Sequence, residues 1–300
     1  MNHFLEISEL SRPDIERLLQ RALFFKKEKT HPSFAGHRLA NLFYENSTRT
    51  RVSFELAAQH LSIPVVNLDM AASSERKGEI IEDTLKNLVA MGIDLFVIRH
   101  KEEGVQQRLA EHLGGAVHLI NAGDGTHAHP SQAMLDLMTI LENKPDISQL
   151  KIAIVGNIRH SRVANSLQCL FSLMGVKELI LVAPDVWLPK TVHFGSTTTS
   201  FREGITDADV VITLRVQHER LSEDDHMDLQ TYRNNYALTR QTLRYAKPDA
   251  MVMHPGPVNR GVEIDSDVAD GSQSFILQQV KNGVFMRMAI IETLLSNDRL

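Results

Sequence analysis

Hydroxyl and arginine side chains are interleaved at residues 47–51, where the sequence reads Ser-Thr-Arg-Thr-Arg two residues after the apolar run 39–44. Free backbone N–H groups and the positive end of the helix dipole make the start of a helix a binding site for a phosphate. The hydroxyls add hydrogen-bond donors, and an arginine adds a two-pronged cationic fork. The alternative is ordinary capping of a helix by Ser47 or Thr48, with arginines that face solvent. Three hydroxyls interleaved with two arginines favour the phosphate interpretation.

Four further loops carry polar residues directly after an apolar run. They contain Arg99-His100, residues 123–132, Arg215-Val216-Gln217 and His254-Pro255-Gly256-Pro257. In open α/β sheets, ligands bind beyond the carboxyl ends of the strands, so these loops are expected to converge. Several separate arginines in one crevice indicate a small substrate with more than one anionic group. Taken alone, Arg162 and Arg215 are equally compatible with exposed surface positions.

The segment His127-Ala128-His129-Pro130 leaves three interpretations open. Two histidines at this spacing could bind a metal, but no cysteine and no clear third ligand lie nearby in the sequence. His129 could be a structural residue before a helix that begins with proline. It could also be a neutral imidazole that polarises a carbonyl group. Local spacing does not decide between these roles.

The composition is that of a globular protein with a substantial core. Of the 300 residues, 43% are hydrophobic, and the length fits two domains. The formal net charge of −5 excludes a broad basic surface for nucleic acid. A single cysteine, Cys169, excludes an intrachain disulfide and fits a reducing compartment. With no secretion signal and no apolar run long enough to span a bilayer, we expect a cytoplasmic protein without a membrane or nucleic-acid partner.

Short apolar runs alternate with helical patterns along most of the chain. The strands and helices that they predict must position these loops. The predicted strands cover 39–44, 65–68, 95–99, 118–121, 151–155, 179–182, 210–214 and 251–254, and the clearest predicted helices cover 50–61, 79–91, 131–141, 162–174 and 284–295. Ser11 and Asp14 form a capping-box pattern that predicts a further helix. Strands that alternate with helices are typical of doubly wound parallel sheets.

A polar stretch near residues 141–150 divides the pattern into two halves. We expect an α/β fold of two doubly wound parallel-sheet domains, spanning 1–141 and 142–283, with the active site in the cleft between them. The last helix, about 284–300, is apolar on more than one face and is expected to pack back onto the first domain.

The motifs, taken together, resemble those of the carbamoyltransferases. The loops at residues 47–51, 99–100, 129–132, 215–217 and 254–257 occur in the order and context of that family, and the resemblance runs from Phe4 to Leu295. Within the family, Lys77-Gly78-Glu79 and Arg215-Val216-Gln217 are similar to the aspartate branch. The segment Pro257-Val258-Asn259-Arg260-Gly261 resembles that of the bacterial aspartate enzymes. The ornithine branch has a His-Cys-Leu-Pro segment where this chain has His254-Pro255-Gly256-Pro257.

The resemblance implies transfer of the carbamoyl group from carbamoyl phosphate to the amine of L-aspartate, an early step of pyrimidine biosynthesis, with no cofactor and no metal. It implies that Arg49, Thr50, Arg99 and His129 are catalytic, that Ser47, Thr48, Arg49, Thr50, Arg99, His129, Gln132, Pro255 and Gly256 bind carbamoyl phosphate, and that Lys77, Arg162, Arg215 and Gln217 bind aspartate. In this family Ser73 and Lys77 reach the active site of a neighbouring subunit, which implies a homotrimer. Regulatory chains or dihydroorotase stay open as further partners.

Three residues depart from the usual family pattern, although none removes a residue implied to contact substrate. Ala128 replaces a glutamine, Asn46 a frequent proline and Asn157 a frequent aspartate.

Two other functions compete with this interpretation. A non-catalytic scaffold subunit should have lost the cationic residues, yet Arg49, Lys77, Arg99, Arg162 and Arg215 are all present. Carbamoyl transfer to ornithine is disfavoured because two cations facing the acceptor would repel its cationic side chain.

Overall fold

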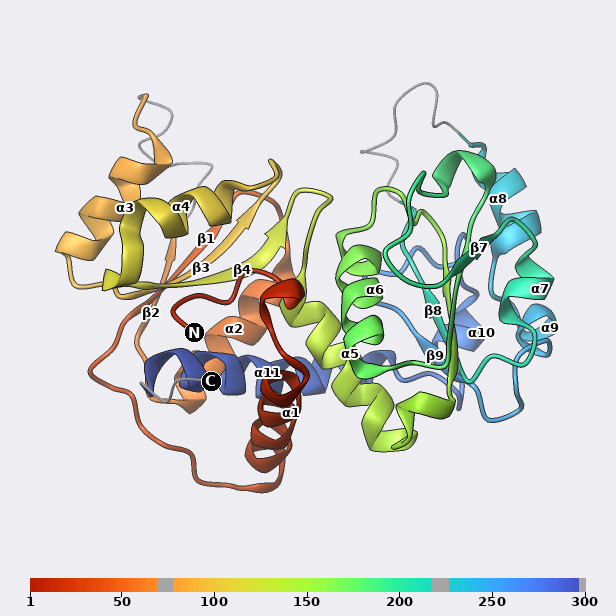
Figure 1. Ribbon diagram of the computed structural model, residues 1–300, viewed down its shortest axis with the longest axis horizontal. Coiled ribbons are helices and arrows are strands. Elements are labelled where there is room, and N and C mark those ends of the chain that lie inside the picture. The colour runs from red at the N-terminus through yellow and green to blue at the C-terminus, as the bar shows by residue number, and fades with distance from the viewer. Residues whose placement is uncertain (69–77, 217–226, 297–300) are drawn as a thin grey trace. The chain divides into compact units, whose positions relative to one another are not determined.

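The computed structural model describes residues 1–68, 78–216 and 227–296. The chain forms two compact units, of which the first comprises Met1–Leu135 with Val280–Leu300 and the second Asp136–Gln279. The division passes through two helices, α5 (Pro130–Asn143) and α11 (Ile276–Leu295), so each of these helices belongs partly to each unit (Figure 1).

The first unit contains a four-stranded parallel sheet in the order β2-β1-β3-β4. Its strands are β1 (Leu39–Phe43), β2 (Val65–Leu68), β3 (Leu95–His100) and β4 (His118–Asp124). Because alternate residues of a strand face opposite sides, Leu42 and Phe96 pack on one face with Leu85 of α3 (Ile81–Ala90) and Leu109 of α4 (Val105–Leu113). Helix α2 (Thr48–His60) covers the other face (Figure 1).

Helix α11 returns to the first unit and packs against two of its helices. The Arg287 guanidinium lies 4.8 Å from the centre of the Phe54 ring on α2. On α1 (Arg12–Lys27), Arg21 forms an ion pair with Glu292, and Lys26 donates a hydrogen bond to Asn282 at 2.8 Å. These contacts join the two ends of the chain in one unit.

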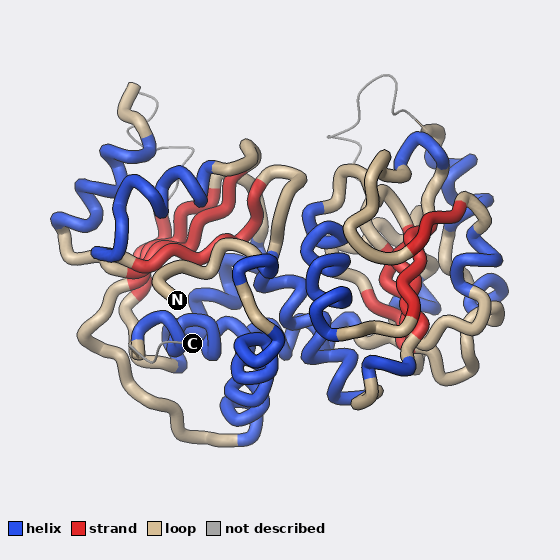
Figure 2. Tube along the Cα trace, viewed as in Figure 1, coloured by secondary structure: helices blue, strands red, loops and turns tan. Residues whose placement is uncertain are grey.

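The second unit contains a five-stranded parallel sheet in the order β7-β6-β5-β8-β9. Figure 2 shows the strands of both sheets in red and the helices in blue. Its strands are β5 (Lys151–Val155), β6 (Glu178–Val182), β7 (Ser196–Thr198), β8 (Val210–Thr213) and β9 (Met251–Met253). Its remaining helices are α6 (Arg162–Met174), α7 (Phe201–Ile205), α8 (Leu229–Tyr236), α9 (Arg240–Leu243) and α10 (Ser266–Ala269). The β5, β8 and β9 strands are almost wholly buried, as their continuous apolar sequences require.

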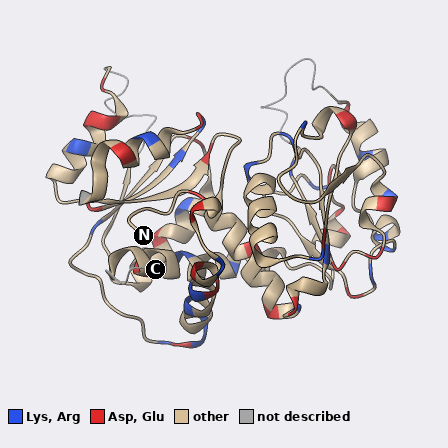
Figure 3. Cartoon of the chain, in the orientation of Figure 1, with Lys and Arg blue, Asp and Glu red and all other residues tan. Residues whose placement is uncertain are grey.

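The structure confirms the predicted fold class of two parallel-sheet α/β domains, and each predicted strand is present with small changes in its bounds. The capping box at α1 is also present, because the Ser11 side chain accepts from Asp14 N and the Asp14 carboxylate accepts from Ser11 N. The last helix begins at Ile276, earlier than predicted. Lys and Arg residues are interspersed with Asp and Glu in both units (Figure 3).

Candidate active site

In each sheet, the direction in which successive strands are added reverses at one position. Polar loops follow the two strands on either side of that position. In the first unit the chain order reverses between β1 and β3, and in the second between β5 and β8. Such switch points leave a crevice at the carboxyl ends of the two strands, where ligands of open α/β sheets bind. The loop at residues 44–47 and the start of α2 follow β1, and Arg99 is the second-last residue of β3. Arg162 begins the helix after β5, and Arg215 follows β8.

The start of α2 has the features of an anion-binding site. Ser47 precedes the helix but its side chain makes no capping bond; its Oγ instead donates to Thr50 Oγ1 at 2.9 Å. Ser47 is therefore not an ordinary N-cap. The positive end of the helix lacks a side-chain cap. Arg49 is exposed, although partial desolvation lowers the pKa of its guanidinium. An arginine titrates so far above neutral pH that Arg49 stays charged.

Arg99 lies beside this loop with its guanidinium held from two sides. Its Nη1 donates to the Ala122 carbonyl at 3.2 Å, and its Nε lies 3.3 Å from Glu45 Oε2. Both members of this ion pair are mostly buried. The pairing of β1 with β3 sets this contact, because Phe43 and Arg99 are register partners. Sequence reasoning missed Glu45, whose only signal was an acidic residue between a strand and a cationic loop.

His129 is buried immediately before α5, and a tight turn leads into it. Its carbonyl accepts from the backbone N–H groups of Gln132 and Ala133, which begins the helix. The turn is closed by two backbone bonds between Asp124 and Ala128. Gln132 is buried as well, so the structure places two of the predicted carbamoyl-phosphate residues in the interior of the first unit.

His127, the other histidine of this segment, binds a carboxylate. Its Nε2 lies 2.7 Å from Glu6 Oε1, and this hydrogen bond raises the pKa of the imidazole above its ordinary value. Nowhere in residues 1–68, 78–216 and 227–296 do three or more His, Cys, Asp or Glu side chains gather as metal ligands. None of the helices in that part of the chain has the length and apolar character to span a bilayer.

The second unit places Arg162 and Arg215 after neighbouring strands. Arg162 is only 5% exposed, which contradicts the alternative of a surface cation. It begins α6, whose N-cap Ser161 accepts from Ala164 N. Arg215 is half-buried, and the preceding Leu214 donates its backbone N–H to Val155, which ties the end of β8 to the end of β5.

The segment 254–259 follows β9 and contacts the Arg215 segment. Asn259 Nδ2 donates to the Val216 carbonyl at 3.3 Å, and Asn259 N donates to Glu263 Oε1 at 2.6 Å. The loop that contains Pro255 and Gly256 is thus joined to the segment that follows Arg215. Glu263 was not singled out from the sequence, where it looks like an ordinary acidic residue of a loop. Ser73, Lys77 and Gln217 lie outside the described residues.

Comparison with known families matches both halves of the chain. Residues 2–142 match the carbamoyl-phosphate-binding domain of the aspartate/ornithine carbamoyltransferases, and residues 148–294 match the aspartate/ornithine-binding domain. The chain is 66% identical to the aspartate carbamoyltransferase catalytic subunit of Legionella pneumophila (strain Corby), over 99% of this chain and 100% of that protein. It is 48% identical to the subunit of the same name from Coxiella burnetii (strain Dugway 5J108-111), over 99% and 97% of the two chains.

Solved structures agree with these matches. Aspartate transcarbamoylase from Trypanosoma cruzi, in complex with carbamoyl aspartate and phosphate, aligns with a TM-score of 0.89 at 30% identity, over 97% of this chain and 95% of that chain. Ornithine carbamoyltransferase from Pyrococcus furiosus aligns with a TM-score of 0.87 at 25% identity, over 99% and 98% of the two chains. The chain belongs to the aspartate/ornithine carbamoyltransferase family.

Proposed function

We propose that this protein transfers the carbamoyl group of carbamoyl phosphate to the amine of L-aspartate, which gives N-carbamoyl-L-aspartate and phosphate, an early step of pyrimidine biosynthesis. The observation that carries the proposal is 66% identity, over nearly the whole chain, to a subunit named aspartate carbamoyltransferase. The Trypanosoma cruzi relative has been solved with carbamoyl phosphate and aspartate, and with carbamoyl aspartate and phosphate.

The donor is assigned to the loops of the first unit and to one loop of the second. The uncapped start of α2, with Ser47, Thr48, Arg49 and Thr50, holds the phosphate. Thr50, Arg99 and His129 face the carbonyl oxygen, while Gln132 and the carbonyls of Pro255 and Gly256 accept from the carbamoyl NH2.

The acceptor is assigned to cations of the second unit, which suit a dicarboxylate. Arg162 binds the α-carboxylate of aspartate, and Arg215 with Gln217 binds the β-carboxylate. A buried arginine such as Arg162 requires an anionic or carbonyl partner to offset its desolvation, and a substrate carboxylate contributes to that role. Ornithine has only one carboxylate and a cationic side chain, so it fits two arginines less well.

The reaction requires no covalent intermediate with the protein. The aspartate amine attacks the carbonyl carbon, negative charge grows on the carbonyl oxygen, and the C–O bond to phosphate then breaks. Preoriented donors at that oxygen lower the barrier because they act where charge develops, and holding both substrates in place contributes several kcal/mol more. The departing phosphate takes a proton from the amine.

The proposed assembly is a cytoplasmic homotrimer in which Ser73 and Lys77 complete the active site of a neighbouring subunit. The relatives are named catalytic subunits, which is in keeping with an oligomer. A regulatory chain or dihydroorotase is a further partner to test for by co-purification.

Parallel assays of carbamoyl transfer to L-aspartate and to L-ornithine test the proposal. We expect carbamoyl aspartate to form and carbamoyl ornithine to be negligible at equal acceptor concentration. Preferential transfer to ornithine would assign the chain to the other branch of the family. No transfer to either acceptor by the folded protein would favour a non-catalytic scaffold.

A further inference from the structure

The His254 side chain lies fully buried between two partners in the second unit. Its Nδ1 accepts the backbone N–H of Gly256 at 2.7 Å, and its Nε2 lies 3.2 Å from Glu263 Oε1. The Glu263 side chain is also fully buried. On the backbone side, His254 N donates to Gln279 Oε1 at 3.0 Å, and Gln279 Nε2 donates to Asp136 at 2.7 Å. The residue is therefore fixed through both its main chain and its ring.

The two ring contacts determine which nitrogen of the neutral His254 carries the proton. The backbone N–H of Gly256 can only donate, so Nδ1 must offer a lone pair. The proton of the neutral ring then lies on Nε2, which donates it to the Glu263 carboxylate. A carboxylate on that side favours this tautomer over the one with a proton on Nδ1, which could not accept from Gly256.

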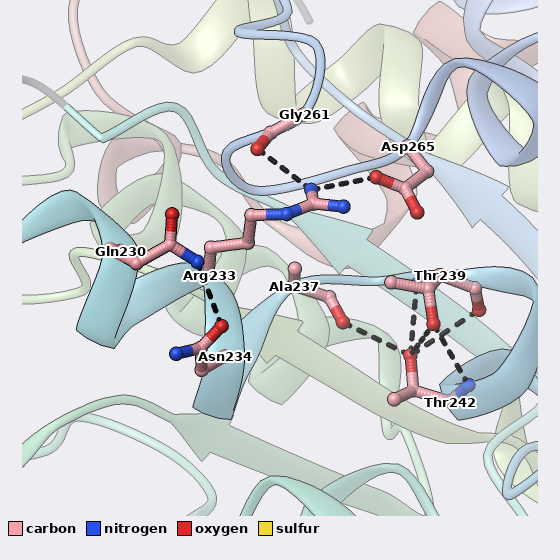
Figure 4. A network of polar contacts seen from close by, with 8 residues as sticks. All are labelled: Gln230, Arg233, Asn234, Ala237, Thr239, Thr242, Gly261 and Asp265. Atoms are coloured by element: carbon pink, nitrogen blue, oxygen red, sulfur yellow. Dashed lines mark hydrogen bonds and ion pairs between the residues drawn. The ribbon is translucent and has the colours of Figure 1, made fainter.

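The segment that carries Glu263 is itself held in place. Arg233 of α8 donates through Nη1 to the Gly261 carbonyl and to Asp265 Oδ1, each at 2.7 Å (Figure 4). Leu238 N donates to the Glu263 carbonyl at 2.9 Å. The carboxylate is thus presented to His254 from a backbone anchored on both sides, which limits its freedom to move away.

The tautomer of His254 sets the direction of one backbone carbonyl. Gly256 N–H and Pro255 C=O belong to the same peptide unit, which is trans because the cis bond of this segment is the following one, Gly256-Pro257. In a planar trans peptide the N–H and C=O point in opposite directions. The bond from Gly256 N–H to the ring therefore turns the Pro255 carbonyl away from His254.

We propose that Glu263 is a positioning residue for carbamoyl-phosphate binding. It holds His254 with the proton on Nε2, so that Nδ1 holds Gly256 N–H and the Pro255 carbonyl is directed to the carbamoyl NH2 of the donor. This inference rests on the proposed function, because the role of the Pro255 carbonyl is part of that proposal. Glu263 touches no substrate in this scheme and acts only through His254 and the loop.

Two substitutions of His254 form a matched pair. In His254→Asn the side-chain oxygen occupies the place of Nδ1 and still accepts Gly256 N–H, whereas in His254→Gln the amide reaches the place of Nε2. We expect the dissociation constant of carbamoyl phosphate to rise about tenfold or more in His254→Gln, and clearly less in His254→Asn. Glu263→Ala should resemble His254→Gln, and Glu263→Gln, which keeps an oxygen acceptor, should lie nearer the wild type.

Binding of N-(phosphonacetyl)-L-aspartate distinguishes a variant whose Pro255 carbonyl has turned from a variant whose whole site is damaged. The compound contains a phosphonate, the dicarboxylate and an amide whose N–H stands in for the aspartate amine. It has no carbamoyl NH2, so it lacks the group that is assigned to the Pro255 carbonyl. We expect its affinity to stay near the wild-type value in the same variants that bind carbamoyl phosphate weakly. Nitrogen-15 chemical shifts of the His254 ring should report a protonated Nε2 in the wild type and a change in Glu263→Ala.

Three outcomes would overturn the inference. One is a parallel loss of affinity for both compounds in a variant that remains folded by circular dichroism. Another is equal carbamoyl-phosphate affinity in His254→Asn and His254→Gln, and the third is a proton on Nδ1 in the wild type. A wild-type protein that transfers no carbamoyl group to aspartate would instead contradict the proposed function.

Discussion

His129 is buried at the start of α5, where its side chain is assigned to the carbonyl oxygen of the donor. Thr50 and Arg99 share that assignment, so the negative charge of the intermediate does not depend on one donor. We expect His129→Ala to lower kcat by about a hundredfold or somewhat more, the usual cost of one oxyanion donor, without abolishing turnover. Steady-state rates at saturating concentrations of both substrates measure this. Complete loss of activity in a variant with unchanged thermal unfolding would contradict a purely polarising role.

His127 and Glu6 form a titrating pair beside that residue. Their hydrogen bond raises the pKa of His127 above 6.5 and lowers that of Glu6 below 4.5. The raised pKa stabilises the fold below pH 6.5, and this contribution is lost as the pH rises through the folded value. The lowered pKa stabilises the fold above pH 4.5, and this contribution is lost as the pH falls through the folded value.

We therefore expect Glu6→Gln to lower the pKa of His127, as measured by NMR titration of its ring. Because both side chains are half-exposed, the cost in unfolding free energy should be below about 1 kcal/mol. It should be larger at pH 5.5 than at pH 8.5, because the contribution of the raised His127 pKa is lost as the pH rises. Glu16→Gln on α1, which removes an exposed ion pair with Arg12, serves as the control and should leave the pKa of His127 unchanged. A cost that grows toward pH 8.5 would contradict the assignment.

The end of β5 packs so closely on the end of β8 that only glycine fits at position 156. Gly156 has φ +133°, and a Cβ there would lie 2.9 Å from the Leu214 carbonyl oxygen, next to Arg215. We expect Gly156→Ala to cost about 1–3 kcal/mol of stability and to raise the KM for aspartate by displacing Arg215. Gly175→Ala is the matched control, because Gly175 also has a positive φ (+73°) but open space around it. Equal effects of the two substitutions on that KM would mean that backbone strain alone is responsible.

Strands were easier to predict than helices or contacts. Continuous apolar runs such as Lys151–Val155 and Val210–Thr213 are buried from both sides, so burial leaves a direct trace in the sequence. Helices α4 and α8 were not predicted, although Val105 and Leu109 of α4 occur at helical spacing. They are short and carry many polar residues, which weakens the periodic signal.

Site residues were predictable where the strand-end rule or the family resemblance applied, and not where distant segments meet. The rule located Ser47 and Arg215 because each follows a strand, and Arg99 because it lies at the carboxyl end of one. It could not reveal that Glu45 pairs with Arg99 or that Glu263 faces His254, since those contacts depend on side-chain directions and on loop geometry. Burial of Arg162 was equally hidden, because a cation at the start of a helix is exposed in many proteins.

At the scale of the whole molecule, an active site that is shared between subunits can be tested by mixing two inactive variants. In the proposed homotrimer each site takes Arg49 from one chain and Lys77 from its neighbour. Arg49→Ala and Lys77→Ala should each be nearly inactive, since the first loses the phosphate fork and the second a cation from the adjacent chain. In a closed ring of three chains that contains both variants, one interface always joins a chain with an intact Arg49 to a neighbour with an intact Lys77.

Mixed trimers, formed by dissociating and reassembling the two variants together, should therefore recover about a third of the wild-type activity per trimer. Reassembly of each variant alone is the control and should restore nothing. Sedimentation of the wild type measures whether trimers form at all. Trimers that recover no activity on mixing would place Lys77 in the same site as its own Arg49, and a monomer with full activity would remove the need for a shared site, so the experiment tests assembly and residue assignment independently.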